Sequence, residues 1–150
     1  MADDSQELAR LRDEIDAIDG ELLRLINERA RLAHRIGEIK QGNIYRPERE
    51  AEVLRMALAR NDGPLRDEEI LRLFREIMSA CLAQEKPLKV AYLGPEGTYS
   101  QSAVLKHFGH SVRALSLASI DEVFQEVQAG NADFGVVPVE NSSEGTVNNT

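Results

Sequence analysis

The sequence predicts a chain of two parts, an all-α segment of three helices followed by a small α/β lobe with a parallel sheet. Three observations predict this arrangement. Apolar residues recur at a 3-4 spacing between Leu8 and Ile39, with no proline among them. Two further striped segments follow before Pro87. Beyond Lys89, short apolar runs alternate with helix-forming segments, which is typical of β-α-β units.

The first helix carries an apolar seam with a single charged member. Its seam positions are Leu8, Leu11, Ile15, Ile18, Leu22, Leu25, Arg29, Leu32, Ile36 and Ile39. A helix of this span is roughly 48 Å long, at 1.5 Å per residue. A compact globule of about 150 residues has a radius of gyration of only roughly 15 Å. The helix therefore cannot bury its seam within its own chain, and we expect a second copy of the chain to cover it.

Two shorter helices are expected after the first. Pro47 suits the first turn of a helix that runs over about 47–60 and stops at the Asn-Asp-Gly-Pro sequence of 61–64. A third helix, over about 66–85, has an acidic first turn that matches the helix dipole. We therefore assign 1–86 to an all-α domain and 87–89 to a linker.

The remaining segment, 90–150, is expected to form the α/β lobe. The expected strands are 90–93, 112–117 and 134–139, and the expected helices are 100–108 and 119–129. Ser119 and Glu122 have the spacing of a capping box. The β-α-β-α-β order predicts a parallel sheet. Three strands make a small sheet, so we interpret this segment as part of a larger lobe.

The composition argues against several classes of function. The net charge is −8, and a nucleic-acid partner is not expected because phosphate neutralisation needs a basic face. Cys81 is the only cysteine, so no disulfide can form within the chain, and we expect a cytoplasmic protein. The acidic N-terminus lacks a secretory signal, and the apolar runs are too short to span a bilayer. We expect no cofactor and no metal.

Basic residues on the first helix share a face. Lys40 follows Arg29 by three turns, about 16 Å along the axis, so two long cationic side chains could close on a small anion. Arg12 lies roughly 25 Å from Arg29, too far to contact that anion from the same chain. An antiparallel partner helix would bring it to the other chain's site. Taken alone, Arg29 is more typical of a residue that reaches solvent or sets helix register.

Charged residues also interrupt the apolar faces of the other two helices. Glu50 is in line with Val53, and Arg49 is a cation in a first turn, where the dipole disfavours it. Glu85 extends the third helix's stripe beyond Cys81. A helix-end charge that reaches solvent is the commoner explanation for each one. Together they predict a basic pocket with two carboxyl groups, suited to a small dianion.

Residues 6–86 resemble the all-helical class of chorismate mutase. The matching motifs are LRDEID (11–16), ERA (28–30), GEIK (37–40), YRPERE (45–50) and SACLAQE (79–85). The resemblance implies an intertwined homodimer of three-helix chains, with chorismate bound at two sites that are each built from both chains. The substrate-binding residues that it implies are Arg12 of the partner subunit, Arg29, Lys40, Arg49, Glu50, Cys81 and Glu85.

Among these residues, Lys40, Glu85 and Arg29 are implied as catalytic. Three positions depart from the pattern of some members. Arg46 is found where some have aspartate, Cys81 where some have serine, and Glu85 where some have glutamine. A glutamate at position 85 can donate a hydrogen bond only when it is protonated.

From Val90 onward the chain is similar to prephenate dehydratase, through GPEGTYS (94–100) and VPVENS (137–142). The order, mutase then dehydratase, is that of the bifunctional enzymes of phenylalanine biosynthesis. The resemblance makes 90–150 a truncated first lobe, a partial βαβαβ unit of periplasmic-binding-protein-like type. It implies Glu140, Asn141 and Ser142 as prephenate-binding residues. The family's Thr-Arg-Phe motif does not occur in the sequence, so we expect no dehydratase activity from these residues.

An alternative reading is a non-catalytic protein, with a helical dimerisation module joined to a ligand-binding α/β lobe. It accounts for the seam and the lobe. It does not account for four charged residues on apolar faces: Arg29, Lys40, Glu50 and Glu85. A bare coiled-coil adaptor is disfavoured by Arg29 in the seam and by the helix breaks near Gly42 and Gly63.

Overall fold

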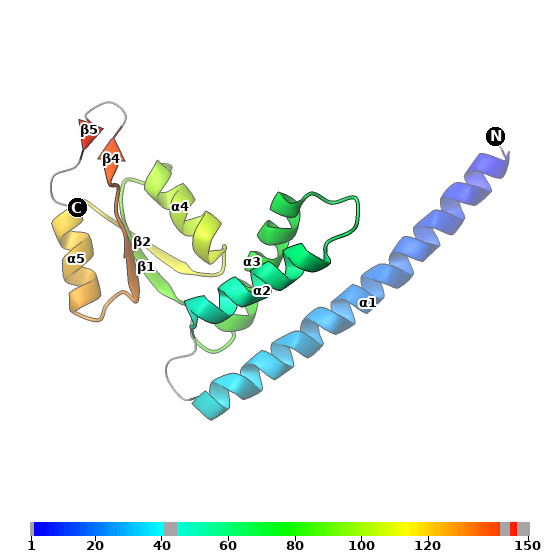
Figure 1. The fold of residues 1–150 in the computed structure, drawn as a ribbon, viewed down its shortest axis with the longest axis horizontal. Helices are drawn as coiled ribbons and strands as arrows, with labels where there is room; N and C mark the ends of the chain where they lie inside the picture. The colour runs from blue at the N-terminus through cyan, green and yellow to red at the C-terminus, as the bar shows by residue number, and fades with distance from the viewer. Residues whose placement is uncertain (1, 41–44, 142–144, 147–150) are drawn as a thin grey trace.

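The structure is a computed structural model that describes residues 2–40, 45–141 and 145–146 (Figure 1). Its elements, in chain order, are α1 (Ala2–Lys40), α2 (Pro47–Arg60), α3 (Asp67–Ala83), β1 (Lys89–Leu93), α4 (Tyr99–Phe108), β2 (Arg113–Leu117), α5 (Ile120–Gln128), β3 (Phe134–Val136), β4 (Glu140–Asn141) and β5 (Gly145–Thr146). The predicted order of helices and strands is confirmed over the predicted elements.

Helix α1 is 39 residues long, and its N-terminal half projects away from every other element (Figure 1). The apolar members of its seam are all exposed, from 42% at Leu11 to 77% at Ile39. An apolar surface of this extent is unusual on a monomeric soluble protein and marks an interaction site. The chain therefore leaves its longest apolar surface uncovered, as the length of the helix predicts.

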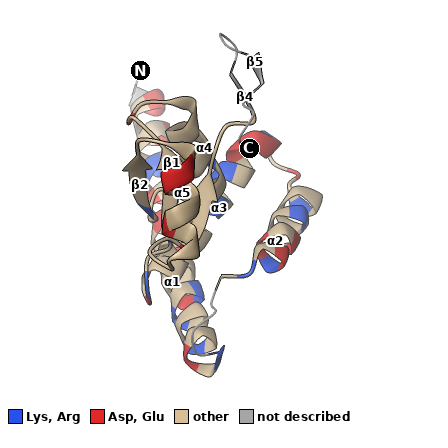
Figure 2. Ribbon diagram, turned by 90° about the vertical axis from the view of Figure 1, so that its left-hand side faces the viewer, with Lys and Arg blue, Asp and Glu red and all other residues tan. Residues whose placement is uncertain are grey.

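The C-terminal half of α1 packs on α3, and α3 packs on α2. Gly37 of α1 is buried, and the carbonyl of Ala30 accepts a hydrogen bond from Gln84 Nε2 at 3.0 Å. In the α2–α3 turn, Asn61 Nδ2 donates to Leu65 O at 3.0 Å and to Asp67 Oδ1 at 2.9 Å. These contacts join α1 and α2 to α3. In Figure 2 charged residues cover much of α1, α2 and α3 and also mark α5, while the strands are largely uncharged.

The elements β1 to β3, α4 and α5 form the α/β lobe (89–136), a parallel sheet in the order β2-β1-β3. Successive β1 side chains point to opposite faces of the sheet. Val90 packs with Val104 of α4 on one face, while Ala91 packs with Val123 of α5 on the other. The predicted parallel β-α-β-α-β unit is confirmed.

One predicted strand is longer than the observed one. We predict 134–139 from its apolar content, but β3 ends at Val136, just before Val137 and Pro138. Proline has no backbone N–H to donate to a neighbouring strand, which accounts for the early end. The antiparallel pair β4–β5 that follows is not predicted from the sequence.

The capping box at the start of α5 is confirmed, although one of its two hydrogen bonds is made with the neighbouring residue. Ser119 Oγ accepts from Glu122 N at 3.2 Å, while Glu122 Oε2 accepts from Ala118 N at 2.9 Å rather than from Ser119 N.

Among the helices of the described ranges, none combines the length and the apolar content needed to cross a bilayer.

Candidate functional site

Two adjoining cavities lie between the three helices, and they share Arg29, Arg49 and Val53. The larger has a volume of about 570 Å³. Its lining residues include Arg29, Ile36, Lys40, Tyr45, Arg46, Glu48, Arg49, Glu50, Val53 and Leu82. The smaller has a volume of about 470 Å³ and extends toward the far end of α2. Volumes of this size hold small-molecule ligands.

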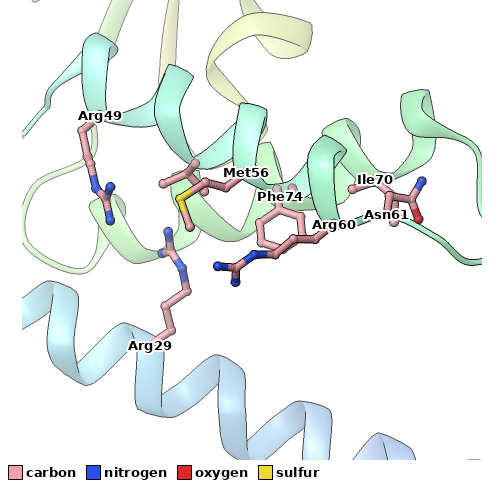
Figure 3. Close-up of a pocket in the computed structure, with 9 residues that line it drawn as sticks. Arg29, Arg49, Met56, Arg60, Asn61, Ile70 and Phe74 are labelled. Atoms are coloured by element: carbon pink, nitrogen blue, oxygen red, sulfur yellow. The ribbon is translucent and has the colours of Figure 1, made fainter.

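The cavities bring basic side chains from different helices together. Arg29 reaches up from α1 and Arg49 reaches down from α2, so that their guanidinium groups face each other across the smaller cavity (Figure 3). Arg60 brings a third guanidinium group into the same space, where it points toward Arg29 (Figure 3). Converging cations between apolar walls favour an anionic ligand, because the apolar walls weaken solvent screening.

Four of the predicted site residues line the larger cavity together: Arg29, Lys40, Arg49 and Glu50. Arg29 and Lys40 come from one face of α1, three turns apart, and Lys40 is the last residue of that helix. Arg49 and Glu50 come from the first turn of α2, which Pro47 begins. Arg49 Nη1 also donates to Glu52 Oε2 at 3.1 Å. The result is a cavity lined by these three cations, by Arg46 as a fourth, and by the half-buried carboxyl group of Glu50.

Glu50 is the most strongly desolvated carboxyl group in this cavity's lining. Burial raises its pKa, and the positive charges of Arg29 and Arg75 oppose that rise only in part. A group with a raised pKa retains its proton to higher pH than an exposed glutamate does. Glu50 can therefore donate a hydrogen bond to a ligand over a wider pH range.

This raised pKa predicts a dependence of stability on pH. The protonated form of Glu50 is favoured in the folded state, so its stabilising effect is complete below the ordinary pKa of 4.5 and is lost as the pH rises through the raised value. We expect Glu50→Gln to unfold at a higher urea concentration than the wild type at pH 7, and at the same concentration at pH 4. Urea unfolding at both pH values measures this, with the exposed Glu48→Gln as the matched control. An equal shift at both pH values would contradict the prediction.

Three other predicted residues do not line these two cavities. Arg12 is exposed on the projecting half of α1. Cys81 is buried, with 6% of its surface exposed. Glu85 contacts His34 Nδ1, on a face of α1 about 140° around from Arg29. Within one chain, the structure thus brings four of the seven predicted residues together.

Tyr45 and Arg60 are among the lining residues that sequence reasoning missed. Arg60 follows Arg49 by 11 residues, which is the spacing that relates Lys40 to Arg29, so the same rule applied to α2 finds it. Tyr45 precedes α2 and belongs to no periodic pattern. Arg46, whose role the sequence left open, lines the larger cavity, and its Nη1 is 3.7 Å from Glu48 Oε1.

The residues implied for prephenate lie elsewhere. Glu140 and Asn141 form β4, which pairs with β5, and Ser142 lies outside the described residues. The described part of the chain contains no group of three or more His, Cys, Asp or Glu side chains placed to hold a metal ion.

Comparisons with known proteins relate the chain to two protein families. Residues 11–86 match the family model described as chorismate mutase type II, and residues 90–150 match the one described as prephenate dehydratase. A bifunctional chorismate mutase/prephenate dehydratase of Stutzerimonas stutzeri is 57% identical over 98% of this chain and 42% of its own length. A protein of the same description from Escherichia coli K12 is 31% identical over 94% of this chain and 42% of its own length.

A solved structure gives the same result for the helical part. A chorismate mutase (form II) of Thermus thermophilus is 40% identical, with a TM-score of 0.50, and the match covers 53% of this chain and 94% of that one. The chain spans about two fifths of the length of the curated bifunctional relatives. Through residues 11–86, this chain belongs to the type II chorismate mutase family.

Proposed function

We propose that this chain is a chorismate mutase, which converts chorismate to prephenate by a pericyclic rearrangement. The observation that supports the proposal best is that Arg29, Lys40, Arg49 and Glu50 line a single apolar-walled cavity. Chorismate carries two carboxylates, an ether oxygen and a ring hydroxyl. The cavity offers cations for the carboxylates, a hydrogen-bond donor for the ether oxygen and a carboxyl group for the ring hydroxyl.

The reaction needs no nucleophile. In one step the ether C–O bond breaks while a C–C bond forms, and negative charge grows on the ether oxygen. Fixed donors at that oxygen lower the barrier because they stabilise the transition state more than the ground state. Lys40 is the proposed donor, and Arg29 would hold a carboxylate so that chorismate keeps the folded conformer that reacts. Arg49 would support the pocket and Glu50 would contact the ring hydroxyl.

The complete site is proposed to need two chains. The exposed seam of α1 would pair with that of an antiparallel partner, as expected for an isologous dimer. Arg12 of the partner subunit would then reach the second carboxylate. Cys81 and Glu85 would line the rest of the site, with Glu85 exchanging its contact with His34 for the substrate.

The second part of the chain is proposed to belong to the next step of the same pathway. We assign 1–86 to the mutase domain, 87–89 to the linker and 90–150 to the first lobe of a prephenate dehydratase. In a longer protein, as in the bifunctional relatives, this lobe would act on the prephenate that the mutase domain forms. Phenylalanine biosynthesis is the proposed pathway.

Loss of the ultraviolet absorbance of chorismate tests the proposed mutase activity directly. We expect the purified chain to consume chorismate with saturation kinetics, and proton NMR to identify prephenate as the product in equal amount. A rate of chorismate loss no higher than the uncatalysed rate, or a product other than prephenate, would refute the proposal.

A further inference from the structure

Three aromatic rings join the helical part of the chain to the α/β lobe. Tyr45, which precedes α2, has its ring centroid 5.1 Å from that of Phe134 on β3, in an edge-on arrangement at 78°. It is also 6.0 Å from the ring of Phe108, at the end of α4. The rings of Phe108 and Phe134 are 5.5 Å apart. These separations lie within the range in which aromatic pairs attract each other.

Polar contacts hold the same two parts together at α3. The carboxylate of Glu76 accepts a hydrogen bond from His110 N, 3.1 Å from each oxygen, and His110 Nδ1 is 2.7 Å from Glu76 Oε1. Ser79 Oγ accepts from Ser111 N at 3.3 Å. Burial opposes ionisation of Glu76, but the hydrogen bonds and the charge of His110 outweigh it and lower its pKa. The lobe therefore contacts α3 through hydrogen bonds to an ionised carboxylate.

Gly109 allows the lobe to come this close to α3. Its φ is +82°, and a Cβ atom at this position would be 2.5 Å from the Cβ of Ser79. Both the backbone conformation and the close approach require glycine. Gly130, at the end of α5, has nearly the same φ of +81°, but a Cβ atom there would meet nothing within 4 Å. A substitution at Gly130 therefore strains the backbone without disturbing the contact between the lobe and α3.

Tyr45 also belongs to the larger cavity, which it lines together with Lys40 and Glu50. Burial and, second, the negative charge of Glu50 raise the pKa of Tyr45 to about 12. Its hydroxyl group therefore stays protonated at neutral pH and can donate a hydrogen bond. Tyr45 contacts the lobe with its ring while it forms part of the wall of the cavity.

We propose that the α/β lobe completes the mutase pocket by holding Tyr45 in its wall, so that contact between the lobe and the helices strengthens chorismate binding. Tyr45 is a positioning residue in this proposal, which rests on the proposed mutase function. The first turn of α2 begins two positions after Tyr45 and carries Arg49 and Glu50. If the lobe moves away, the segment leading into that turn loses its aromatic contacts with Phe108 and Phe134. Chorismate binding must then restore the position of Tyr45, and this free-energy cost weakens the affinity for chorismate.

Matched glycine variants of the whole chain test the proposal. We expect Gly109→Ala to raise KM for chorismate roughly 3- to 10-fold, the factor that corresponds to one aromatic contact, with kcat changed less than twofold. Gly130→Ala also places a side chain at a positive φ, but away from the helices, and we expect it to leave KM within about twofold of wild type. Equal KM values for the two variants would overturn the proposal.

A double variant and a spectroscopic measurement complete the test. In a Tyr45→Ala background, Gly109→Ala should raise KM no further, whereas the same fold increase as in the wild-type background would overturn the proposal. NMR of labelled tyrosine gives a result that needs no activity, because Phe108 and Phe134 shift the ring signals of Tyr45. Gly109→Ala should move these signals and Gly130→Ala should not. If the wild-type chain does not consume chorismate, the proposed function fails, and the NMR result still decides whether the lobe holds Tyr45.

Discussion

Replacing Lys40 by methionine is expected to lower kcat for chorismate about 100- to 1,000-fold, the usual cost of removing one donor to a developing negative charge. Methionine keeps an unbranched apolar stem and lacks only the terminal ammonium position, so the packing at the end of α1 is largely retained. The lost group is the ammonium ion that we place at the ether oxygen. Because that oxygen gains charge only as the C–O bond breaks, the defect should lie in kcat more than in KM.

The measurement is initial-rate kinetics at saturating chorismate, with circular dichroism to verify folding. Arg31→Ala is the matched control, because Arg31 lies on the same helix and lines a different cavity, with His34 and Gln84. We expect that variant to retain wild-type kcat. A Lys40→Met enzyme whose kcat stays within threefold of wild type would show that the donor at the ether oxygen is another residue.

Periodicity predicted the helices well because each covers several turns. The seam from Leu8 to Ile39 lies entirely within α1, and Pro47 marks the start of α2. The short strands are predicted less well at their ends. The expected strand at 134–139 includes Pro138, and its apolar content alone does not reveal that the pairing with β1 stops at Val136.

Regular helix geometry also determines which site residues can be predicted from sequence. Arg29 and Lys40 lie within a regular helix, so their spacing fixes their common face and the structure places them on one cavity. Glu85 lies two positions beyond Ala83, where α3 ends. Helical periodicity no longer determines its direction there, and it contacts His34 instead of lining the cavity.

The contact between the two parts of the chain could not be predicted from sequence at all. Tyr45, Phe108 and Phe134 are far apart in sequence and belong to three different local patterns. Each looks like an ordinary apolar residue of its own segment. Only the packing of the lobe against α3 and against the residue that precedes α2 brings the rings together, and no local rule describes that packing.

If each site is built from two chains, substitutions at Arg12 and at Arg29 should each abolish activity, and mixed dimers should recover part of it. We expect Arg12→Ala and Arg29→Ala homodimers each to lose nearly all activity, since every site in them lacks one cation for a carboxylate. In a mixed dimer, one site combines the intact Arg29 of the first variant with the intact Arg12 of the second. Random exchange makes half the dimers mixed, each with one intact site of two, so about a quarter of wild-type activity should return.

The control pair decides whether such recovery reflects sharing between chains. Arg29 and Lys40 reach a given site from the same chain. Mixing Arg29→Ala with Lys40→Met therefore leaves one substituted residue in every site of the mixed dimer, and no activity should return. Arg12 lies on the exposed, projecting half of α1, roughly 25 Å from Arg29, and can reach a carboxylate held there only in a neighbouring chain. Verified heterodimers of the first pair that stay inactive would exclude the shared site, and recovery in the control pair would show that activity returns for another reason.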